Sequence, residues 1–325
     1  MQKFNIPNTD LVASHIGFGC MNLGGQWHRQ PYSAEERSRA IAAIEIAYEC
    51  GINFFDHADI YVFGKSEQIF SEIWQIHPNL RDDIILQSKC GIRFPDDPEK
   101  GLPGRYDFSF EHIVTSVENI LDRLKVDNLD ILLLHRPDPL MEPEEVAKAF
   151  FALRSSGKVC HFGVSNFTAG QIALLQSYID QPLIVNQVEL NLLHSHLINE
   201  GVVFNQNNAN ARFTDGTLDY CRLHKMFIQA WSPVAQGVIL RDSSEVNEPH
   251  LKATTALVQQ LAEAKQTSRE AIVLSWLLRH PANIQPIIGT TKPERIRASA
   301  MADASLLTRE EWYSLFVAAR GGKMP

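Results

Sequence analysis

The sequence predicts an α/β protein built as a single (β/α)8 TIM barrel, and three observations support this fold class. Short apolar runs rich in β-branched and aromatic residues recur along the chain. They are continuously apolar rather than alternating, as expected for parallel strands covered on both faces. Amphipathic helical patterns separate most of them, which favours a parallel sheet that closes on itself. The eight runs are 16–20, 52–55, 83–89, 129–135, 161–165, 183–188, 226–231 and 283–289.

Start and stop signals mark the helices between these runs. Ser33 opens a capping box before the first helix, and Gly51 follows its end. Ser109 is expected to cap the helix after the third strand. Pro143 stands near the start of the next helix and Gly157 near its end, which is the usual asymmetry of these two residues.

Three further segments lie outside the repeating pattern. Residues 4–16 read as a hairpin that plugs the barrel floor, and residues 307–319 as an extra C-terminal helix. The polar, Asn-rich segment 198–217 reads as a long loop that replaces or precedes a helix before the seventh strand. Because no Pro-, Gly- or Ser-rich linker divides the chain, we expect one domain over residues 1–325.

The doubly wound dinucleotide-binding fold is the main alternative. Its glycine-rich motif should follow the first strand, but Asn22 occupies the position of the third glycine. We therefore reject this fold and expect Gly17 and Gly19 to serve a tight bend.

Composition excludes several classes of function. The formal net charge of −8 argues against a nucleic-acid-binding protein. The five cysteines are scattered and form no C-x-x-C pair, which suggests reduced thiols. No apolar run is long enough to span a membrane, and the N-terminal residues show no secretory pattern. We expect a cytoplasmic protein that binds neither membranes nor nucleic acid.

Ionisable and hydroxyl groups cluster where the predicted strands end. Asp56 ends the second strand and Tyr61 follows in its loop, Lys89 ends the third strand, and His135 ends the fourth. Each residue alone could be an ordinary structural one. In a barrel, however, all the carboxyl ends of the strands open onto one face, so these four groups are expected to converge there.

These groups together suit the reduction of a carbonyl. A phenol has a pKa near 10, and an ammonium group beside it lowers that pKa. A carboxylate paired with the lysine would compensate the buried cation, and a histidine could orient the substrate oxygen. We therefore predict a short contact between Tyr61 and Lys89 and a tyrosine acting as general acid beside a hydride donor.

The motifs that surround these residues resemble the successive signatures of the aldo-keto reductases, and in particular of bacterial oxidoreductase-type members. They occur in the family's order and extend over residues 16–299. They read DHADIYVFGKSE (56–67), LQSKCG (86–91), LLLHRPD (132–138), FGVSNF (162–167), NQVELN (186–191), WSPVAQG (231–237) and IIGTTKPERI (287–296).

The resemblance implies roles for the clustered residues. Tyr61 would be the general acid and base, Lys89 its partner, Asp56 the partner of Lys89, and His135 the group that orients the carbonyl. The substrate would be a small aldehyde or ketone. Trp27, Phe94 and the loop 136–141 are candidates for its pocket, whereas Cys90 should face away because side chains alternate along a strand.

The resemblance also implies an NADP(H) site. Ser165, Asn166 and Gln187 would hydrogen-bond the nicotinamide carboxamide, and Trp231 would stack on the ring. The expected phosphate- and adenosine-binding residues are Ser232, Gly237, Thr290, Thr291, Lys292, Arg295 and Ser299. NAD remains possible, because the chain reads Ala298-Ser299 where relatives often carry Glu-Asn and has Gly289 where other branches place a lysine.

Two other functions remain open at this point. A metal-dependent barrel hydrolase would use His57, Asp59 and His135 with the pair His194 and His196, which can share a face of an extended segment. A non-enzymatic, NADP(H)-binding regulatory subunit that senses redox state would need the same barrel. The complete Tyr, Lys, Asp and His set favours an enzyme over both.

Overall fold

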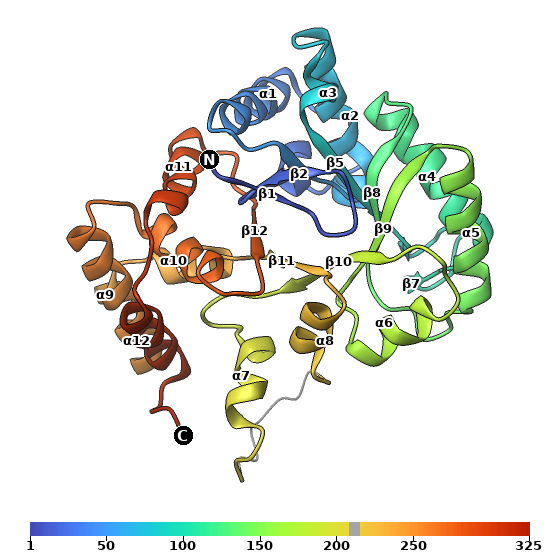
Figure 1. Cartoon of the computed structure of the whole chain (residues 1–325). Coiled ribbons are helices and arrows are strands. Elements are labelled where there is room, and N and C mark those ends of the chain that lie inside the picture. The colour runs from blue at the N-terminus through green and yellow to red at the C-terminus, as the bar shows by residue number, and fades with distance from the viewer. Residues whose placement is uncertain (208–214) are drawn as a thin grey trace.

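The computed structural model describes residues 1–207 and 215–325. Within these residues, eight parallel strands form a closed barrel in the order β10-β11-β12-β3-β4-β5-β8-β9 (Figure 1). The strands are β3 (Gly17–Gly19), β4 (Phe54–Asp56), β5 (Ile85–Cys90), β8 (Leu129–Leu134), β9 (Val159–Ser165), β10 (Leu183–Glu189), β11 (Phe227–Trp231) and β12 (Ile284–Ile288). They match the eight predicted runs, which confirms the fold class.

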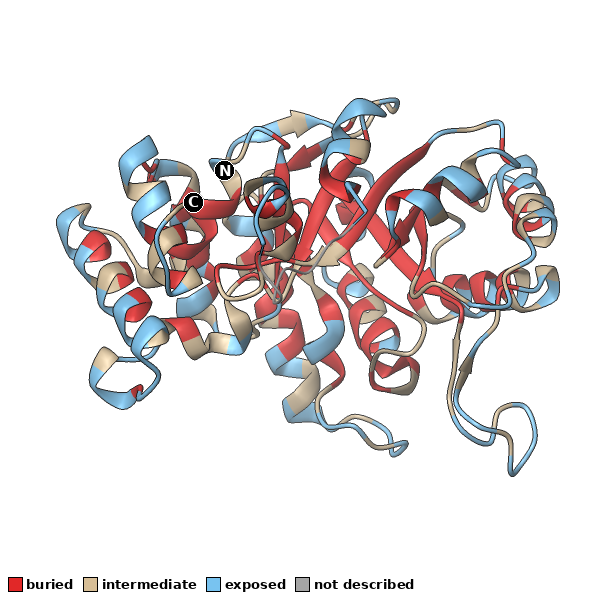
Figure 2. Cartoon of the chain, turned by 90° about the horizontal axis from the view of Figure 1, so that it is seen from below, coloured by how far each residue is buried: buried red, intermediate tan, exposed pale blue. Residues whose placement is uncertain are grey.

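Helices surround the barrel, and their inner faces are buried while their outer faces are exposed (Figure 2). Ser33 accepts a hydrogen bond from the Glu36 backbone in a complete capping box, and Ser109 caps α4 by accepting one from the His112 backbone. Pro143 is the first residue of α5, as predicted. The helices are α1 (Ala34–Glu49), α2 (Lys65–Ser71), α3 (Leu80–Asp83), α4 (Phe110–Leu124), α5 (Pro143–Ser155), α6 (Ala169–Gln176), α7 (His196–Val203), α8 (Thr217–Leu223), α9 (Pro249–Ala264), α10 (Arg269–Leu278), α11 (Pro293–Ala300) and α12 (Arg309–Arg320).

The N-terminal hairpin and the C-terminal helix are both present where they were predicted. The hairpin consists of β1 (Lys3–Asn5) and β2 (Val12–Ser14) and lies across the amino-terminal end of the barrel (Figure 1). Helix α12 packs on α9. A second hairpin, β6 (Ile92–Arg93) and β7 (Arg105–Tyr106), follows β5 and was not predicted.

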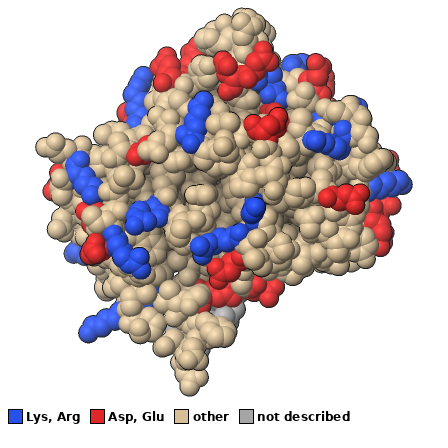
Figure 3. Space-filling view, in the orientation of Figure 1, with Lys and Arg blue, Asp and Glu red and all other residues tan. Residues whose placement is uncertain are grey.

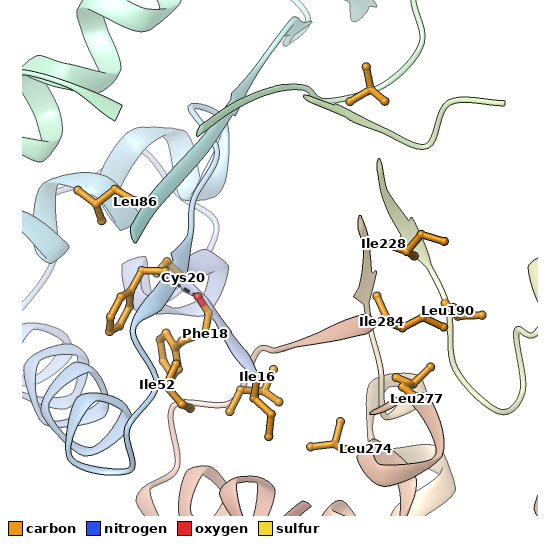
Figure 4. Packing of buried hydrophobic residues seen from close by; sticks show 14 of the residues in the cluster. Ile16, Phe18, Cys20, Ile52, Leu86, Leu190, Ile228, Leu274, Leu277 and Ile284 are labelled. Atoms are coloured by element: carbon orange, nitrogen blue, oxygen red, sulfur yellow. Dashed lines mark hydrogen bonds between the residues drawn. The ribbon is translucent and has the colours of Figure 1, made fainter. Parts of the chain in front are cut away.

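Two apolar clusters divide the core. The larger one lies between the strands and the helices, and Figure 4 shows Leu274 and Leu277 of α10 packed near Ile284 of β12. The smaller one fills the lower barrel interior and joins the hairpin residues Ile6 and Ala13 to strand residues. The two clusters arise because neighbouring residues of a strand point to opposite sides of the barrel wall.

The glycines of the first barrel strand have a different role from the one predicted. Gly17 and Gly19 lie within β3 itself and form no tight bend. A Cβ at Gly17 would come within 2.5 Å of Ile287 Cδ1, and one at Gly19 within 3.2 Å of the Ile288 carbonyl oxygen. These glycines therefore allow β12 and β3 to pack closely where the barrel closes.

The segment 198–217 also differs in part from the prediction. Its first residues belong to α7, which begins at His196, so the expected loop starts as a helix. Residues 208–214 of the predicted loop lie outside the described residues. The prediction treated polar, Asn-rich composition as loop, but the apolar residues Leu197, Ile198 and Val203 give α7 a buried face.

The surface carries charges of both signs. On the face that bears the N-terminal hairpin, Lys and Arg are interspersed with Asp and Glu (Figure 3). In the described parts of the chain, no helix has the length and apolar character needed to cross a membrane.

Candidate active site

The predicted contact between the phenol and the ammonium group is present at the carboxyl end of the barrel. Lys89 Nζ donates a hydrogen bond to the Tyr61 hydroxyl at 3.0 Å and another to the His57 carbonyl oxygen at 2.8 Å. It also lies 2.7 Å from Asp56 Oδ1 and 2.8 Å from Oδ2. All three donors of the fully buried ammonium group therefore have partners.

Strand geometry explains this arrangement. Asp56 is the last residue of β4 and is paired in the sheet with Gln87 of β5, two positions before Lys89. Two positions along a strand return to the same face, so the Asp56 and Lys89 side chains both enter the barrel interior. Tyr61 follows β4 in a tight turn.

The turn after Tyr61 is strained. Val62 and Phe63 have φ values of 48° and 59°, in the left-handed region that β-branched and aromatic residues rarely adopt. Such conformations cost about 1–3 kcal/mol each and are concentrated at functional sites. Here the turn ends at Gly64 and leads directly into α2, which leaves Tyr61 facing the barrel axis beside Lys89.

The pKa of Tyr61 differs from the sequence-based expectation. Burial raises it, and the opposing effect of the Lys89 ammonium group is smaller, so the net pKa lies above its usual value. For Lys89, burial alone would lower the pKa, but Asp56 and Tyr61 outweigh it and raise the pKa. The prediction of a net lowering at Tyr61 was wrong because it counted the charge and not the desolvation. At neutral pH the phenol keeps its proton and can donate it.

His135 follows β8 directly and its ring lies edge-on to the Tyr61 ring, with the centroids 5.9 Å apart. Burial holds the pKa of His135 well below its usual value, and the charges of Lys89 and Arg136 act in the same direction. Its Nδ1 is buried and has no hydrogen-bond partner in the described structure. A neutral imidazole beside a phenol can share a substrate oxygen with it without adding charge.

Three of the residues predicted to hold the nicotinamide lie next to one another. Asn166 Nδ2 donates to Ser165 Oγ at 2.8 Å, and Trp231 Nε1 donates to Asn166 Oδ1 at 3.0 Å. Asn166 has a φ of 64°, a conformation that asparagine tolerates well. The Gln187 side chain points instead into the barrel interior, where Nε2 donates to Gln229 Oε1 at 3.0 Å.

The residues predicted to bind phosphate lie on two neighbouring segments. Ser232 and Gly237 follow β11 with φ values of 50° and 84°, and a Cβ at Gly237 would meet no atom within 4 Å. The other segment follows β12 and enters α11, where Lys292 and Arg295 are exposed and Thr290 and Thr291 half-buried. Ser299, by contrast, is 3% exposed.

This arrangement can be compared with known proteins. The model of the aldo/keto reductase family matches residues 15–316. The chain belongs to the aldo-keto reductase family. It is 38% identical over 301 residues to the oxidoreductase YdhF of Escherichia coli, covering 93% of this chain and 94% of YdhF. It is 35% identical over 322 residues to the 6-dehydroglucose reductase of Agrobacterium fabrum, with 99% of each chain covered.

A solved structure agrees with the fold. The glycerol dehydrogenase of Gluconobacter oxydans superimposes with a TM-score of 0.81 at 22% identity, covering 99% of this chain and 96% of that one. At this identity the likeness shows the fold alone. The family model and the curated relatives place the chain among oxidoreductases of the aldo-keto reductase type, as the sequence motifs predicted.

The histidines and acids that a metal-dependent hydrolase would need do not form a metal site in this aldo-keto reductase. Among the described residues, no group of three or more His, Cys, Asp or Glu side chains is arranged to hold a metal ion. The His194 and His196 rings pack against each other at 4.7 Å, at the start of α7. The hydrolase alternative gains no support.

Sequence reasoning missed Phe63 as a pocket residue, and it missed the contact with Trp231 that Arg136 of the predicted pocket loop makes. Phe63 joins the two predicted pocket aromatics, with ring centroids 5.7 Å from Trp27 and 4.8 Å from Phe94. The Arg136 guanidinium lies 5.4 Å from the Trp231 ring centroid. No sequence pattern indicated these contacts, because they join separate loops. Cys90, as predicted, faces away from Lys89 and lies in the outer apolar core.

A groove of the described surface lies elsewhere. It has a volume of about 900 Å³ and is lined by residues at the amino ends of β4, β5 and β8, among them Asn53, Ile85 and Asp130. Tyr61 and His135 lie at the opposite ends of these strands, so we do not assign the reaction to this groove.

Proposed function

We propose that the protein is an NADP(H)-dependent enzyme that reversibly reduces an aldehyde or ketone to an alcohol. The observation that carries the proposal is the 3.0 Å contact from Lys89 Nζ to the Tyr61 hydroxyl, with Asp56 behind the lysine and His135 beside the tyrosine. A partly buried proton donor held next to a cation is suited to protonating an oxygen that gains negative charge.

The residues present fit a nicotinamide nucleotide. Ser165 and Asn166 offer polar groups beside the half-exposed Trp231 ring, and Asn166 is held in place by the indole N–H. The open space at Gly237 admits a close approach of phosphate. A nicotinamide nucleotide, when bound, would supply the hydride for reduction and accept it for oxidation.

The chain's own residues would handle the substrate oxygen. The neutral His135 imidazole and the Tyr61 hydroxyl orient the carbonyl, and Tyr61 donates its proton as the oxygen becomes an alkoxide. The Lys89 ammonium group stabilises the resulting phenolate, while Asp56 keeps that ammonium group charged and in place. In alcohol oxidation the same groups act in reverse, and the phenolate accepts the proton.

The preference for NADP over NAD rests on α11. Lys292 and Arg295 are exposed at its first turn, and no ion pair ties either one to another described residue. A 2′-phosphate would give these cations a partner. The substrate is proposed to be a small aldehyde or ketone, and similarity to a 6-dehydroglucose reductase favours testing aldehydes derived from sugars.

The test of the proposal is Tyr61→Phe. Its turnover on a panel of aldehydes, ketones and alcohols should fall by about a thousandfold, because general acid catalysis contributes on the order of 10²–10⁴. Its NADPH affinity, measured by fluorescence titration, should stay within about twofold of the wild type. Parallel loss of turnover and affinity would show that the tyrosine is structural.

The cofactor preference has its own test. Arg295→Ala should weaken NADPH binding about tenfold or more while leaving NADH binding nearly unchanged, since a charge-assisted contact to phosphate contributes about 1.5–3 kcal/mol. Arg297→Ala is the matched control, because Arg297 is also exposed on α11 but lies 4.0 Å from Glu49. Equal effects on both nucleotides would contradict a 2′-phosphate role.

A further inference from the structure

Four glutamines form a hydrogen-bonded layer inside the barrel, directly below Asp56. Each is at most 2% exposed. Gln229 is central: its Oε1 accepts from Gln87 Nε2 at 2.8 Å and from Gln187 Nε2 at 3.0 Å, and its Nε2 donates to Gln285 Oε1 at 2.9 Å. The four residues come from β5, β10, β11 and β12.

Strand register explains why these side chains meet. Gln229 is paired with Gln187 on one side and with Gln285 on the other, and Gln87 is paired with Asp56. Layers inside barrels of this kind are usually filled by Val, Ile and Leu. A buried amide costs free energy unless it is hydrogen-bonded, so a polar layer at this height calls for a reason.

The layer reaches both ends of the barrel. At the lower end, Gln285 Nε2 donates to the Ser14 carbonyl oxygen of the N-terminal hairpin at 2.8 Å. At the upper end, Gln87 Nε2 donates to Asp56 Oδ1 at 2.6 Å. Asp56 Oδ1 is also 2.7 Å from Lys89 Nζ, so the amide and the ammonium group share one carboxylate oxygen.

The network determines which way the Gln87 amide points. Its nitrogen has two hydrogens, and they are directed at Asp56 and at Gln229 Oε1. Gln87 Oε1 is buried and has no hydrogen-bond partner among the described residues. The reverse orientation would place that oxygen against a carboxylate oxygen. The amide is therefore held as a donor to Asp56 at the expense of an unpaired carbonyl.

We propose that Gln87 is a positioning residue for the reaction, holding the Asp56 side chain against Lys89 so that the ammonium group stays directed at Tyr61. This inference rests on the proposed function, in which Tyr61 exchanges a proton with the substrate. Gln229, whose Oε1 also accepts a hydrogen bond from Gln187, aims the Gln87 amide.

Removing the Gln87 N–H donor should raise the pKa of Tyr61. Without it, the Asp56 side chain can turn away from Lys89, and an ammonium group that is no longer held against the phenol stabilises the phenolate less. The pKa of Tyr61, already raised by burial, then rises further. The other titratable groups facing the hydroxyl are Cys20, whose thiol pKa burial raises, and His135, whose pKa burial lowers, so both stay neutral.

The experiment compares Gln87→Met with Gln285→Met. Both remove a buried amide of the same layer and keep an unbranched side chain, but only Gln87 touches Asp56. In the full-length enzyme with its nucleotide, the pH at which alcohol oxidation rises should move up by about one unit in Gln87→Met. In Gln285→Met it should stay where the wild type has it.

A second readout needs no nucleotide. The absorbance of tyrosinate is titrated with pH in each variant, and the same titration in a Tyr61→Phe background isolates the contribution of Tyr61. An upward displacement confined to Gln87→Met supports the inference. Unchanged profiles in both variants, or equal displacement in both, would overturn it.

The experiment remains decisive if Gln87→Met does not fold or if the wild type shows no turnover. If Gln87→Met does not fold, Gln87→Asn replaces it, because it keeps an amide that is one methylene too short for the 2.6 Å contact. It must show the same displacement, or the inference fails. If the wild type turns over no alcohol or carbonyl compound, the proposed function fails, and the absorbance titration alone then decides the role of Gln87.

Discussion

The two ends of the barrel interior are built from the same strands but bury opposite kinds of side chain. At the amino end, Phe54 of β4 and Ile85 of β5 pack with the hairpin residue Ile6 in an apolar cluster. At the carboxyl end, the same two strands supply Asp56 and Lys89. The same strands thus line both ends of the barrel interior, and the two ends differ only in whether the inward-facing side chains are apolar or charged.

The difference shows how one scaffold separates stability from function. The amino end gains free energy by removing apolar surface from water. The carboxyl end pays a desolvation penalty for two charges and recovers it only through their mutual contact and hydrogen bonds. Substitutions at the amino end should therefore affect folding alone, whereas those at the carboxyl end should affect activity first. Variants at both ends would break or sharpen this contrast.

Lys89→Met should have the largest effect. Turnover is expected to fall by about a thousandfold or more, because Tyr61 loses its cationic partner. The free energy of unfolding should fall by about 3–5 kcal/mol, since Asp56 is left buried and unpaired. Steady-state kinetics and urea unfolding measure the two losses.

The double variant Lys89→Met with Asp56→Leu separates the loss of turnover from the loss of stability. Replacing a buried ion pair by apolar groups of similar volume is often neutral, so stability should return while activity stays lost. A double variant that remains as unstable as Lys89→Met would contradict the view that the pair serves catalysis at the expense of stability.

Phe54→Ala at the amino end should produce the complementary result. Removing this fully buried ring should cost about 3–5 kcal/mol of unfolding free energy by leaving a cavity. At temperatures where the variant is folded, kcat/KM should stay within about twofold of the wild type. Phe54→Leu is the milder control. A loss of activity comparable to that of Lys89→Met would show that the two ends are not independent.

Asp59→Asn should change the free energy of unfolding least, and its effect should depend on pH because Asp59 is a partly buried acid next to the site. Burial, with the charge of Glu67 adding to it and that of Arg123 opposing it, raises the pKa of Asp59 from 3.8 to about 8. Between these values the native state holds a proton that the unfolded state has released, so this residue makes stability fall as pH rises.

The asparagine variant removes that dependence. We expect it to be about 1–2 kcal/mol more stable than the wild type at pH 8 and little different near pH 4, with the gain limited because the residue is only partly buried and water screens its charge. Urea unfolding at several pH values measures this. Asp122→Asn, which changes an exposed acid, should leave the slope unaltered. A variant that is less stable at pH 8 would show that the Asp59 carboxylate is needed ionised.

Much of this architecture is predictable because its signals are local. Continuous apolar runs and caps such as Ser33 and Ser109 operate within one turn or one strand, and the structure places strands and helices where they indicate. The Lys89–Tyr61 contact was predictable for a related reason, since barrel closure brings all strand ends to one face. The helical start of the segment after β10 was missed because its polar composition outweighed a short apolar face.

The sequence by itself determined the barrel, the identity of the groups at its carboxyl end and the family. Tertiary structure alone decided that β3 uses its glycines to pack against β12, that burial outweighs Lys89 at Tyr61, and that glutamines from four strands form one layer below Asp56. The physical reason is that desolvation and hydrogen bonding depend on distances between residues far apart in the chain. Periodicity and capping, by contrast, depend on neighbours a few positions away.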